Sequence, residues 1–180
     1  MLEKEIKLML SEEEYLRLKN GLRFDGEAVQ TNHYYYSAEC SQRRISVRVR
    51  EIDGKALLQI KLPVSTEGSL AVREELEREL PSVPETVGQE LLSEICGVDG
   101  EARRIGALST LRLLSHQIEN VELCLDRNEY LGITDYELEA EYTGEYPEEA
   151  IALIASFGID TDRPAEGKYS RFLKALKAQK

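Results

Sequence analysis

The sequence predicts an α+β fold, a closed eight-stranded antiparallel β-barrel with flanking helices. Most of the chain consists of short segments in which apolar and polar side chains alternate, which is the period of a β-strand. Short turns join these segments, and they favour antiparallel pairing of successive strands. Helical patterns occur only near the ends and between groups of strands. About eight strands of this kind can close into a barrel, which leaves no exposed sheet edge.

The first element is assigned through the one that follows it. Residues 2–10 alternate like a strand but also permit a helical ion pair four residues apart. Ser11 and Glu14 have the spacing of a capping box, which predicts that a helix begins at Ser11. A helix start at this point favours a strand for residues 2–10. The apolar face of the helix is expected to be Tyr15, Leu18 and Leu22.

The remaining elements follow from alternation and from turn residues. Strands are predicted over residues 31–37, 44–52, 55–62, 69–80, 107–115, 119–128 and 131–142. Asp53-Gly54 is a hairpin turn signal, and Pro63 is expected to end the strand before it. Helices are predicted over residues 84–96, with Gly97 as the stop, over 147–157, and over 168–177.

Composition and charge exclude several classes of protein. The chain has 180 residues, 42% of them hydrophobic, so we expect one globular domain over residues 1–180. There is no apolar run of membrane-spanning length and no secretory signal at the N-terminus. Three scattered cysteines predict neither a disulfide framework nor a zinc site, and they suit a cytoplasmic protein. The net charge of −11 disfavours nucleic-acid binding unless the cations are gathered locally.

The alternating strands carry unusually ionic faces. Arg48 and Arg50 alternate with Val47 and Val49, and Glu137 and Glu139 alternate in the same way with Leu138. A solvated outer face is the ordinary interpretation. However, these faces contain little Ser, Thr or Asn, and helices are available to cover the apolar faces from outside. If the charges line the barrel interior, they are costly unless they are paired or bind ions. An interior of this kind implies a bound divalent cation and a bound polyanion.

An ordered series of motifs resembles the CYTH superfamily, also called triphosphate tunnel metalloenzymes. The ExExK signature is matched by Glu3, Glu5 and Lys7. The later motifs are matched by Arg48 and Arg50, Lys61 before Pro63, Arg73 with Glu75 and Glu77, Arg112, Asp126, Glu137 and Glu139, and Lys168, Arg171 and Phe172. The series covers nearly the whole chain in order, so the resemblance implies the tunnel-shaped barrel of that family.

The resemblance also implies the roles of these residues. One or two Mg²⁺ or Mn²⁺ ions would be held by Glu3, Glu5, Asp126, Glu137 and Glu139. The triphosphate would be bound by Lys7, Arg48, Arg50, Lys61, Arg73, Arg112, Lys168 and Arg171. Lys61, Glu5 and Glu139 are the candidate catalytic residues, and either glutamate could orient the attacking water. Glu75, Glu77 and Glu141 are possible further carboxylates of the tunnel.

The leading hypothesis is a metal-dependent hydrolase of triphosphate substrates, with inorganic triphosphate favoured. Three alternatives remain open: an adenylate cyclase on the same scaffold, a thiamine triphosphatase, and a non-catalytic polyphosphate or nucleotide sensor. The chain contains no Trp that could stack on a thiamine ring. A small-molecule partner is expected, with no nucleic acid and no membrane. His33, His116, the tyrosines 34–36 and the cysteines are expected to have structural or surface roles.

Overall fold

A computed structural model describes residues 2–67, 70–163 and 165–179, with the description of residues 2–3, 64–67 and 70–73 confined to the backbone. The strands are β1 Leu2–Leu10, β2 Gly26–Tyr36, β3 Ser46–Ile52, β4 Lys55–Glu67, β5 Leu70–Leu80, β6 Thr86–Val87, β7 Ala102–Ile118, β8 Val121–Tyr130 and β9 Ile133–Tyr142. The helices are α1 Glu12–Gly21, α2 Ala38–Gln42, α3 Gln89–Cys96, α4 Glu148–Ser156 and α5 Lys168–Ala178. None of these helices combines the length and the apolar character needed to cross a membrane.

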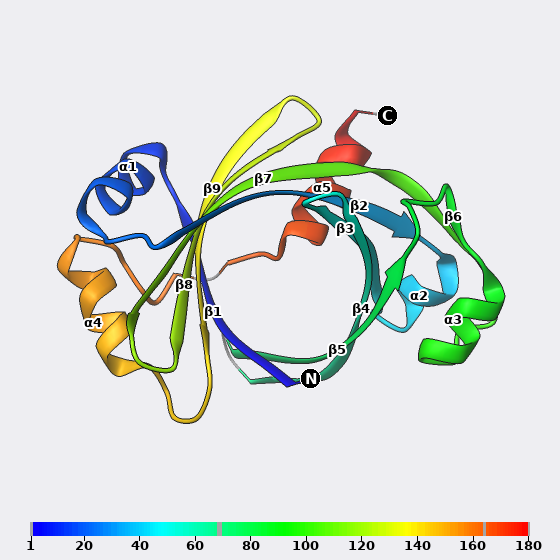
Figure 1. Cartoon of the computed structure of the whole chain (residues 1–180), viewed down its shortest axis with the longest axis horizontal. Coiled ribbons are helices and arrows are strands. Elements are labelled where there is room, and N and C mark those ends of the chain that lie inside the picture. Colours follow the sequence, from blue (N-terminus) through cyan, green and yellow to red (C-terminus); the bar gives the residue numbers. More distant parts are fainter. Residues whose placement is uncertain (1, 68–69, 164, 180) are drawn as a thin grey trace.

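Strand pairing runs in a ring. The hydrogen-bonded order is β2-β3-β4-β5-β1-β9-β8-β7, and β7 pairs with β2 again. All of these pairings are antiparallel. Figure 1 views the molecule through the opening of this ring, with the strands curving around a common centre. The predicted α+β fold with an eight-stranded antiparallel barrel is therefore confirmed. The short β6 pairs with β7 outside this ring.

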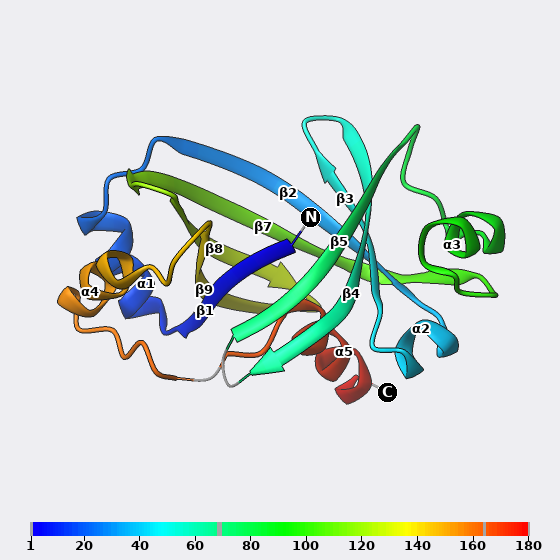
Figure 2. The same cartoon turned by 90° about the horizontal axis from the view of Figure 1, so that it is seen from below.

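The outer face of the ring is apolar and is covered by helices at two places. At one end of the molecule, α1 and α4 pack on β1, β8 and β9, where Leu18, Leu125 and Ile154 are fully buried. At the other end, α2 and α3 pack on β3 and β4, with Leu58 and Leu92 fully buried (Figure 2). This arrangement leaves the charged faces of the strands for the interior, because alternate side chains point to opposite sides of a sheet.

Helix α5 packs differently from the others. Its Phe172 is buried against Tyr34, Leu108 and Tyr130, which lie on the same faces of β2, β7 and β8 as the interior residues. Gly106 makes room for the helix, since a Cβ at this position would lie 2.6 Å from the Phe172 ring. In Figure 1 α5 begins inside the outline of the ring and its C-terminal end extends beyond it, and the Tyr169 hydroxyl of α5 donates to the Tyr35 carbonyl of β2. The helix therefore contributes to the interior of the barrel.

Local sequence signals account for several element boundaries. The Ser11 hydroxyl accepts a hydrogen bond from the Glu14 N–H at 3.2 Å, and the Glu14 carboxylate accepts one from the Ser11 N–H at 2.8 Å. This capping box starts α1 as predicted. Asp53 and Gly54 have φ values of 50° and 73°, the left-handed pair that a type I′ hairpin turn requires.

Several predicted boundaries were wrong or incomplete. The strands predicted over 31–37 and 107–115 begin earlier, at Gly26 and Ala102. The helix predicted over 84–96 begins only at Gln89, because Thr86–Val87 pairs with the edge of β7. The strand predicted to end at Pro63 continues as β4 through a register shift between Pro63 and Ser65, where a missing N–H is tolerated. Helix α2 was not predicted, and Ser69, the expected first residue of the next strand, lies outside the described residues.

Candidate active site

The strand register brings the predicted charged residues to one interior. Lys7 lies opposite Glu139, and Glu5 lies opposite Glu141 across the β1–β9 pair. Asp126 on β8 lies opposite Glu137 on one side and Arg112 on the other. Opposite residues in an antiparallel pair point to the same face of the sheet. The side chains of Arg112, Asp126 and Glu137 therefore form one row across β7, β8 and β9. The interpretation of the ionic faces as the barrel lining follows directly from these pairs.

The barrel encloses a cavity of about 1030 Å³. The predicted residues that line it are Glu5, Lys7, Arg48, Arg50, Lys61, Glu75, Glu77, Arg112, Glu139, Glu141 and Lys168. Asp126, Glu137 and Arg171 lie behind Lys168 and contact it or one another. The side chains of Glu3 and Arg73 lie outside the described residues, and their backbones are partners in the β1–β5 pair.

The β3 and β4 side of the cavity is mainly cationic. The Arg48 Nε donates a hydrogen bond to Gln59 at 2.8 Å, and Lys61 Nζ lies 3.1 Å from Glu75. The Arg50 Nε donates to Asn32 Oδ1 at 3.2 Å. Burial, together with the charges of Arg48 and Arg112, lowers the pKa of Arg50 to about 10. The guanidinium stays charged at neutral pH, but a bound anion would relieve this repulsion.

The β1 and β9 side of the cavity carries a triad of carboxylates. Glu5, Glu139 and Glu141 each place an oxygen within 4.8 Å of the others. Lys7 Nζ lies 2.8 Å from Glu139 and 3.3 Å from Glu5. Burial alone would raise the pKa of Glu139, but the charges of Lys7 and Arg112 outweigh it and lower that pKa. Glu139 is therefore fixed in its ionised form by two cations.

A second acidic triad is buried behind the first. Asp126, Glu137 and Glu139 also have oxygens within 4.8 Å of one another. Lys168 Nζ lies 2.9 Å from Asp126 and 3.0 Å from Glu139, and it forms a short hydrogen bond to Glu137. Burial lowers the pKa of Lys168, but three carboxylates in contact favour its ammonium form. The ammonium group occupies the centre of this triad, where a cation would otherwise bind.

Two arginines complete the neutralisation of this buried triad. Arg112 forms two parallel hydrogen bonds to Asp126, at 2.8 and 2.7 Å, and a short one to Glu139. The Arg171 Nη2 donates to Glu137 at 2.6 Å, and its Nε donates to Asp135 at 2.9 Å. Bidentate arginine–carboxylate pairs of this kind fix geometry as well as charge. Lys168 and Arg171, predicted to bind triphosphate, are thus engaged with carboxylates in this structure.

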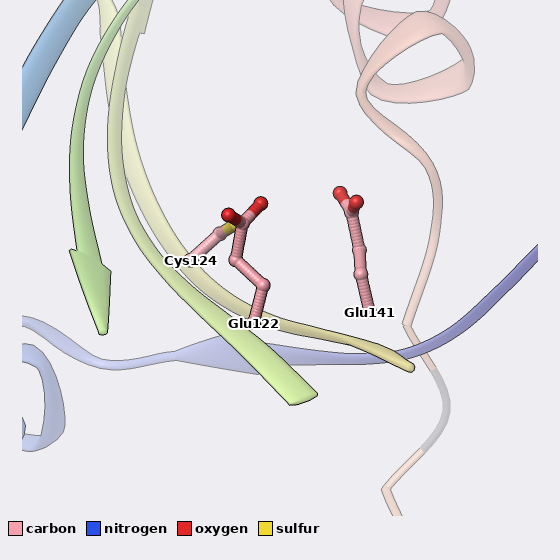
Figure 3. Close-up of side chains that lie close together, drawn as sticks. All are labelled: Glu122, Cys124 and Glu141. Atoms are coloured by element: carbon pink, nitrogen blue, oxygen red, sulfur yellow. The ribbon is translucent and has the colours of Figure 1, made fainter. Parts of the chain in front are cut away.

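A third cluster lies at one mouth of the cavity. Glu122 and Cys124 on β8 approach Glu141 on β9, and Figure 3 shows both carboxyl groups pointing to the same side of the sheet. His116 bridges Asp25 and Glu122 at 2.7 and 2.6 Å. Burial raises the pKa of the Cys124 thiol, which holds it in the protonated form that binds metals poorly. All three cysteines are free thiols, and Cys40 and Cys124 are buried.

Comparison with known proteins decides the family. The CYTH domain model matches residues 1–153. The chain belongs to the CYTH family. No curated protein matches it. Among solved structures, a putative adenylate cyclase from Bacillus halodurans has 26% identity, with 93% of this chain and 95% of that chain covered at a TM-score of 0.70.

Two further structures share the fold. A putative adenylyl cyclase from Hippeastrum, described as having a dominant triphosphatase activity, has 23% identity. It covers 96% of this chain and 95% of its own, at a TM-score of 0.73. A protein from Pyrococcus horikoshii has 18% identity, covers 99% of both chains and has a TM-score of 0.65. The resemblance inferred from the motifs is confirmed by the family match, which ends before Lys168 and Arg171.

Sequence reasoning missed two features of this CYTH site. Asp135 forms an ion pair with Arg171 and lies two residues before Glu137 on β9. The alternation of side chains along this strand therefore predicts that Asp135 shares the inner face with Glu137. The insertion of Lys168 between three carboxylates had no sequence signal, because α5 is separated from β9 by helix α4 and a loop. The tyrosine triplet was correctly assigned to packing at Tyr34, whose ring lies 5.2 Å from that of Tyr169 and 5.1 Å from that of Phe172.

Proposed function

We propose that this CYTH protein is a divalent-metal-dependent hydrolase of triphosphates, and that inorganic triphosphate is its preferred substrate. One observation carries the proposal: cations from β1, β3, β4 and β7 face a single cavity that carboxylates also line. A chain of phosphates offers an acceptor to each cation, and arginine suits phosphate oxygens through paired hydrogen bonds. The products would be phosphate and pyrophosphate.

The donor chemistry of the open triad fits a hard divalent cation. Glu5, Glu139 and Glu141 offer only carboxylate oxygens, which Mg²⁺ and Mn²⁺ prefer. We assign the ion to these residues because all three line the open cavity, whereas Asp126 and Glu137 are fully buried around the Lys168 ammonium. When bound, the ion would supply electrostatic stabilisation of phosphate oxygens and a polarised water.

The chain's own residues divide the remaining work. Arg48, Arg50 and Lys61 would hold the phosphate chain from the β3–β4 side and stabilise charge that builds up in the transition state. Glu139, fixed by Lys7 and Arg112, would keep those two cations pointing into the cavity. Among the described residues, Glu5 forms a single ion pair, to Lys7 at 3.3 Å, so it is better placed than Glu139 to orient a water.

The cavity offers little support for recognition of an aromatic base. Tyr34, Tyr142 and Tyr169 line it, but the rings of Tyr34 and Tyr169 pack against each other and Tyr142 packs against Tyr146. Binding energy should therefore come mainly from the phosphates. An adenylate cyclase and a thiamine triphosphatase both need a ring-binding element, so they rank below the triphosphatase. The cyclase alternative is kept because similar folds carry that description.

A substrate panel tests the proposal. Inorganic triphosphate, ATP and thiamine triphosphate would each be assayed with Mg²⁺ and Mn²⁺, and phosphate, pyrophosphate and cyclic AMP would be measured. A free triphosphate carries more charge than the esterified chain of ATP, so we expect kcat/KM to be at least about tenfold higher, or 1.4 kcal/mol. Equal or faster ATP turnover would reject the preference. Cyclic AMP as the main product would identify a cyclase, and binding without turnover would identify a sensor.

A further inference from the structure

The hydroxyl group of Tyr34 is buried in the cavity wall without an acceptor. The residue is 2% exposed, and within the described residues its hydroxyl has no hydrogen-bond partner. The cations Lys7, Arg48 and Arg50 surround it closely enough to act on its pKa, which burial raises to about 12. A buried donor that stays unpaired costs free energy. A donor placed among cations is suited to an anionic acceptor.

The N-terminus of α5 opens on the same cavity. Gly167, Lys168, Tyr169 and Ser170 all line it. The N-cap residue Gly167 provides no side-chain cap, and the first turn contains no acidic residue. The Arg171 N–H donates to the Gly167 carbonyl at 3.1 Å, so the amide groups of residues 168–170 precede the helical hydrogen-bond ladder. The positive end of an 11-residue helix thus faces the lumen.

Aromatic packing joins the tyrosine and the helix into one unit. The Tyr34 ring packs against Tyr169, which lies in the first turn of α5, and against Phe172 in the next turn. The Tyr169 hydroxyl donates to the Tyr35 carbonyl at 3.2 Å and ties α5 to β2. The hydroxyl and the amides are therefore held in a fixed relation, which favours binding because little ordering is needed.

We propose that the Tyr34 hydroxyl and the first-turn amides of α5 form an oxyanion subsite for one phosphoryl group of the substrate. The inference rests on the proposed function and deepens it. A tetrahedral phosphoryl group presents several oxygens, so it can accept from the phenol and the helix while Arg48 binds another oxygen. The subsite adds neutral donors to the lysine and arginine contacts that the sequence predicted.

The test measures binding of inorganic triphosphate in EDTA by calorimetry, so that turnover does not contribute. Tyr34→Phe removes only the donor, and we expect affinity to fall about tenfold, which corresponds to a hydrogen bond to a charged group. Its melting temperature should stay equal or rise, because no partner loses a bond. Tyr146→Phe, at an exposed ring, is the matched control and should bind like the wild type.

A second variant tests the helix amides. Ser170→Asp places a carboxylate where it can cap α5, so it should stabilise the helix and weaken triphosphate binding at least tenfold. Ser170→Asn adds similar bulk without charge and should lose less. Asn120→Asp adds the same charge elsewhere on the cavity wall and should have a smaller effect than Ser170→Asp.

The outcomes separate the subsite from the function. If Tyr34→Phe and Ser170→Asp bind triphosphate as tightly as the wild type, the subsite is wrong while the triphosphatase activity stands. Equal losses in Ser170→Asn and Ser170→Asp, or in Ser170→Asp and Asn120→Asp, would also overturn it. Wild-type binding without hydrolysis, together with weakened variants, would support the subsite and reject the hydrolase.

Discussion

Replacement of Lys168 by Met should destabilise the protein and create a new cation site. Met keeps the unbranched side chain but removes the ammonium that contacts Asp126, Glu137 and Glu139. Asp126 and Glu137 are fully buried, so their charges cannot be solvated instead. Loss of one partner from a buried ionic cluster costs about 3–5 kcal/mol. At about 2–4 °C per kcal/mol for a chain of this size, the melting temperature should fall by about 6–20 °C.

The matched control lies on the same helix. Lys174 pairs with Glu166 at 2.7 Å, but its side chain is 74% exposed. A surface ion pair contributes at most about 1 kcal/mol, so Lys174→Met should melt close to the wild type. Both variants would be unfolded by heat in EDTA and followed by circular dichroism.

Addition of Mn²⁺ distinguishes a missing cation from a merely damaged core. In Lys168→Met the vacated triad offers three carboxylates, so Mn²⁺ should stabilise this variant more than the wild type. At one hundred times the dissociation constant, the gain is about 2.7 kcal/mol. Melting within about 2 °C of the wild type in EDTA, or an identical Mn²⁺ shift in both proteins, would refute the idea that Lys168 replaces a cation.

Three further predictions address the open side of the cavity and its frame. Glu141→Gln should weaken Mn²⁺ binding, measured by calorimetry, at least tenfold, because it removes one negative charge from the carboxylates that would hold the ion. The metal-free melting temperature should change by less than about 4 °C, because the lost contact to Arg112 is long, at 3.7 Å, and partly exposed; unchanged Mn²⁺ affinity would reject the assignment of the ion. Arg48→Ala, Arg50→Ala and Lys61→Ala should each raise KM and lower kcat, and each should lose about 1.5–3 kcal/mol of transition-state binding, measured as kcat/KM. Arg78→Ala, on the outer face, is the control and should leave the kinetics unchanged. Normal kinetics for all four variants would contradict a cationic tunnel. Gly106→Ala should lower the melting temperature, since its Cβ would lie 2.6 Å from Phe172 at a φ of 151°; an unchanged value would show that α5 can shift.

The sequence predicted the barrel well because one physical rule governs most of it. Alternation assigns each strand and sorts its side chains onto two faces, so Arg48, Lys61 and Glu139 could be placed on the ionic face. The choice of that face as the inner one depended on its almost purely ionic composition, on the helices available to cover the apolar face, and on the family resemblance. The α1 boundary was predictable because a capping box is local. The start of α3 was not predictable from local sequence. Thr86 and Val87 have a helical pattern, but they pair as a short strand with the end of β7, which is distant in the sequence.

The limits of the site prediction have a similar cause. A row of carboxylates in the sequence indicates that cations are needed nearby, but it does not show whether a metal ion or a side chain such as Lys168 supplies them. Lys168 reaches Asp126 only because α5 packs on Tyr34, Leu108 and Tyr130 from inside the ring. That contact depends on the folded barrel and on the space beside Gly106. Sequence motifs therefore grouped all five acidic matches as metal ligands, whereas in the structure Glu5 and Glu139 line the open cavity and Asp126 and Glu137 are fully buried around the Lys168 ammonium.

This separation also explains how an acidic protein can attract a polyanion. The net charge is −11, yet seven Lys and Arg side chains line the cavity beside seven carboxylates, so the cavity wall does not share the negative excess of the chain as a whole. A large polyanion meets the acidic surface first and is repelled. A small one that enters the lumen exchanges water for Arg48, Arg50 and Lys61 in an environment where charge interactions are strong. Lys168 increases the contrast, because neutralising the buried triad internally removes negative charge from behind the position that the phosphates would occupy. The buried ionic cluster thus costs desolvation energy but makes the lumen more favourable for an anion.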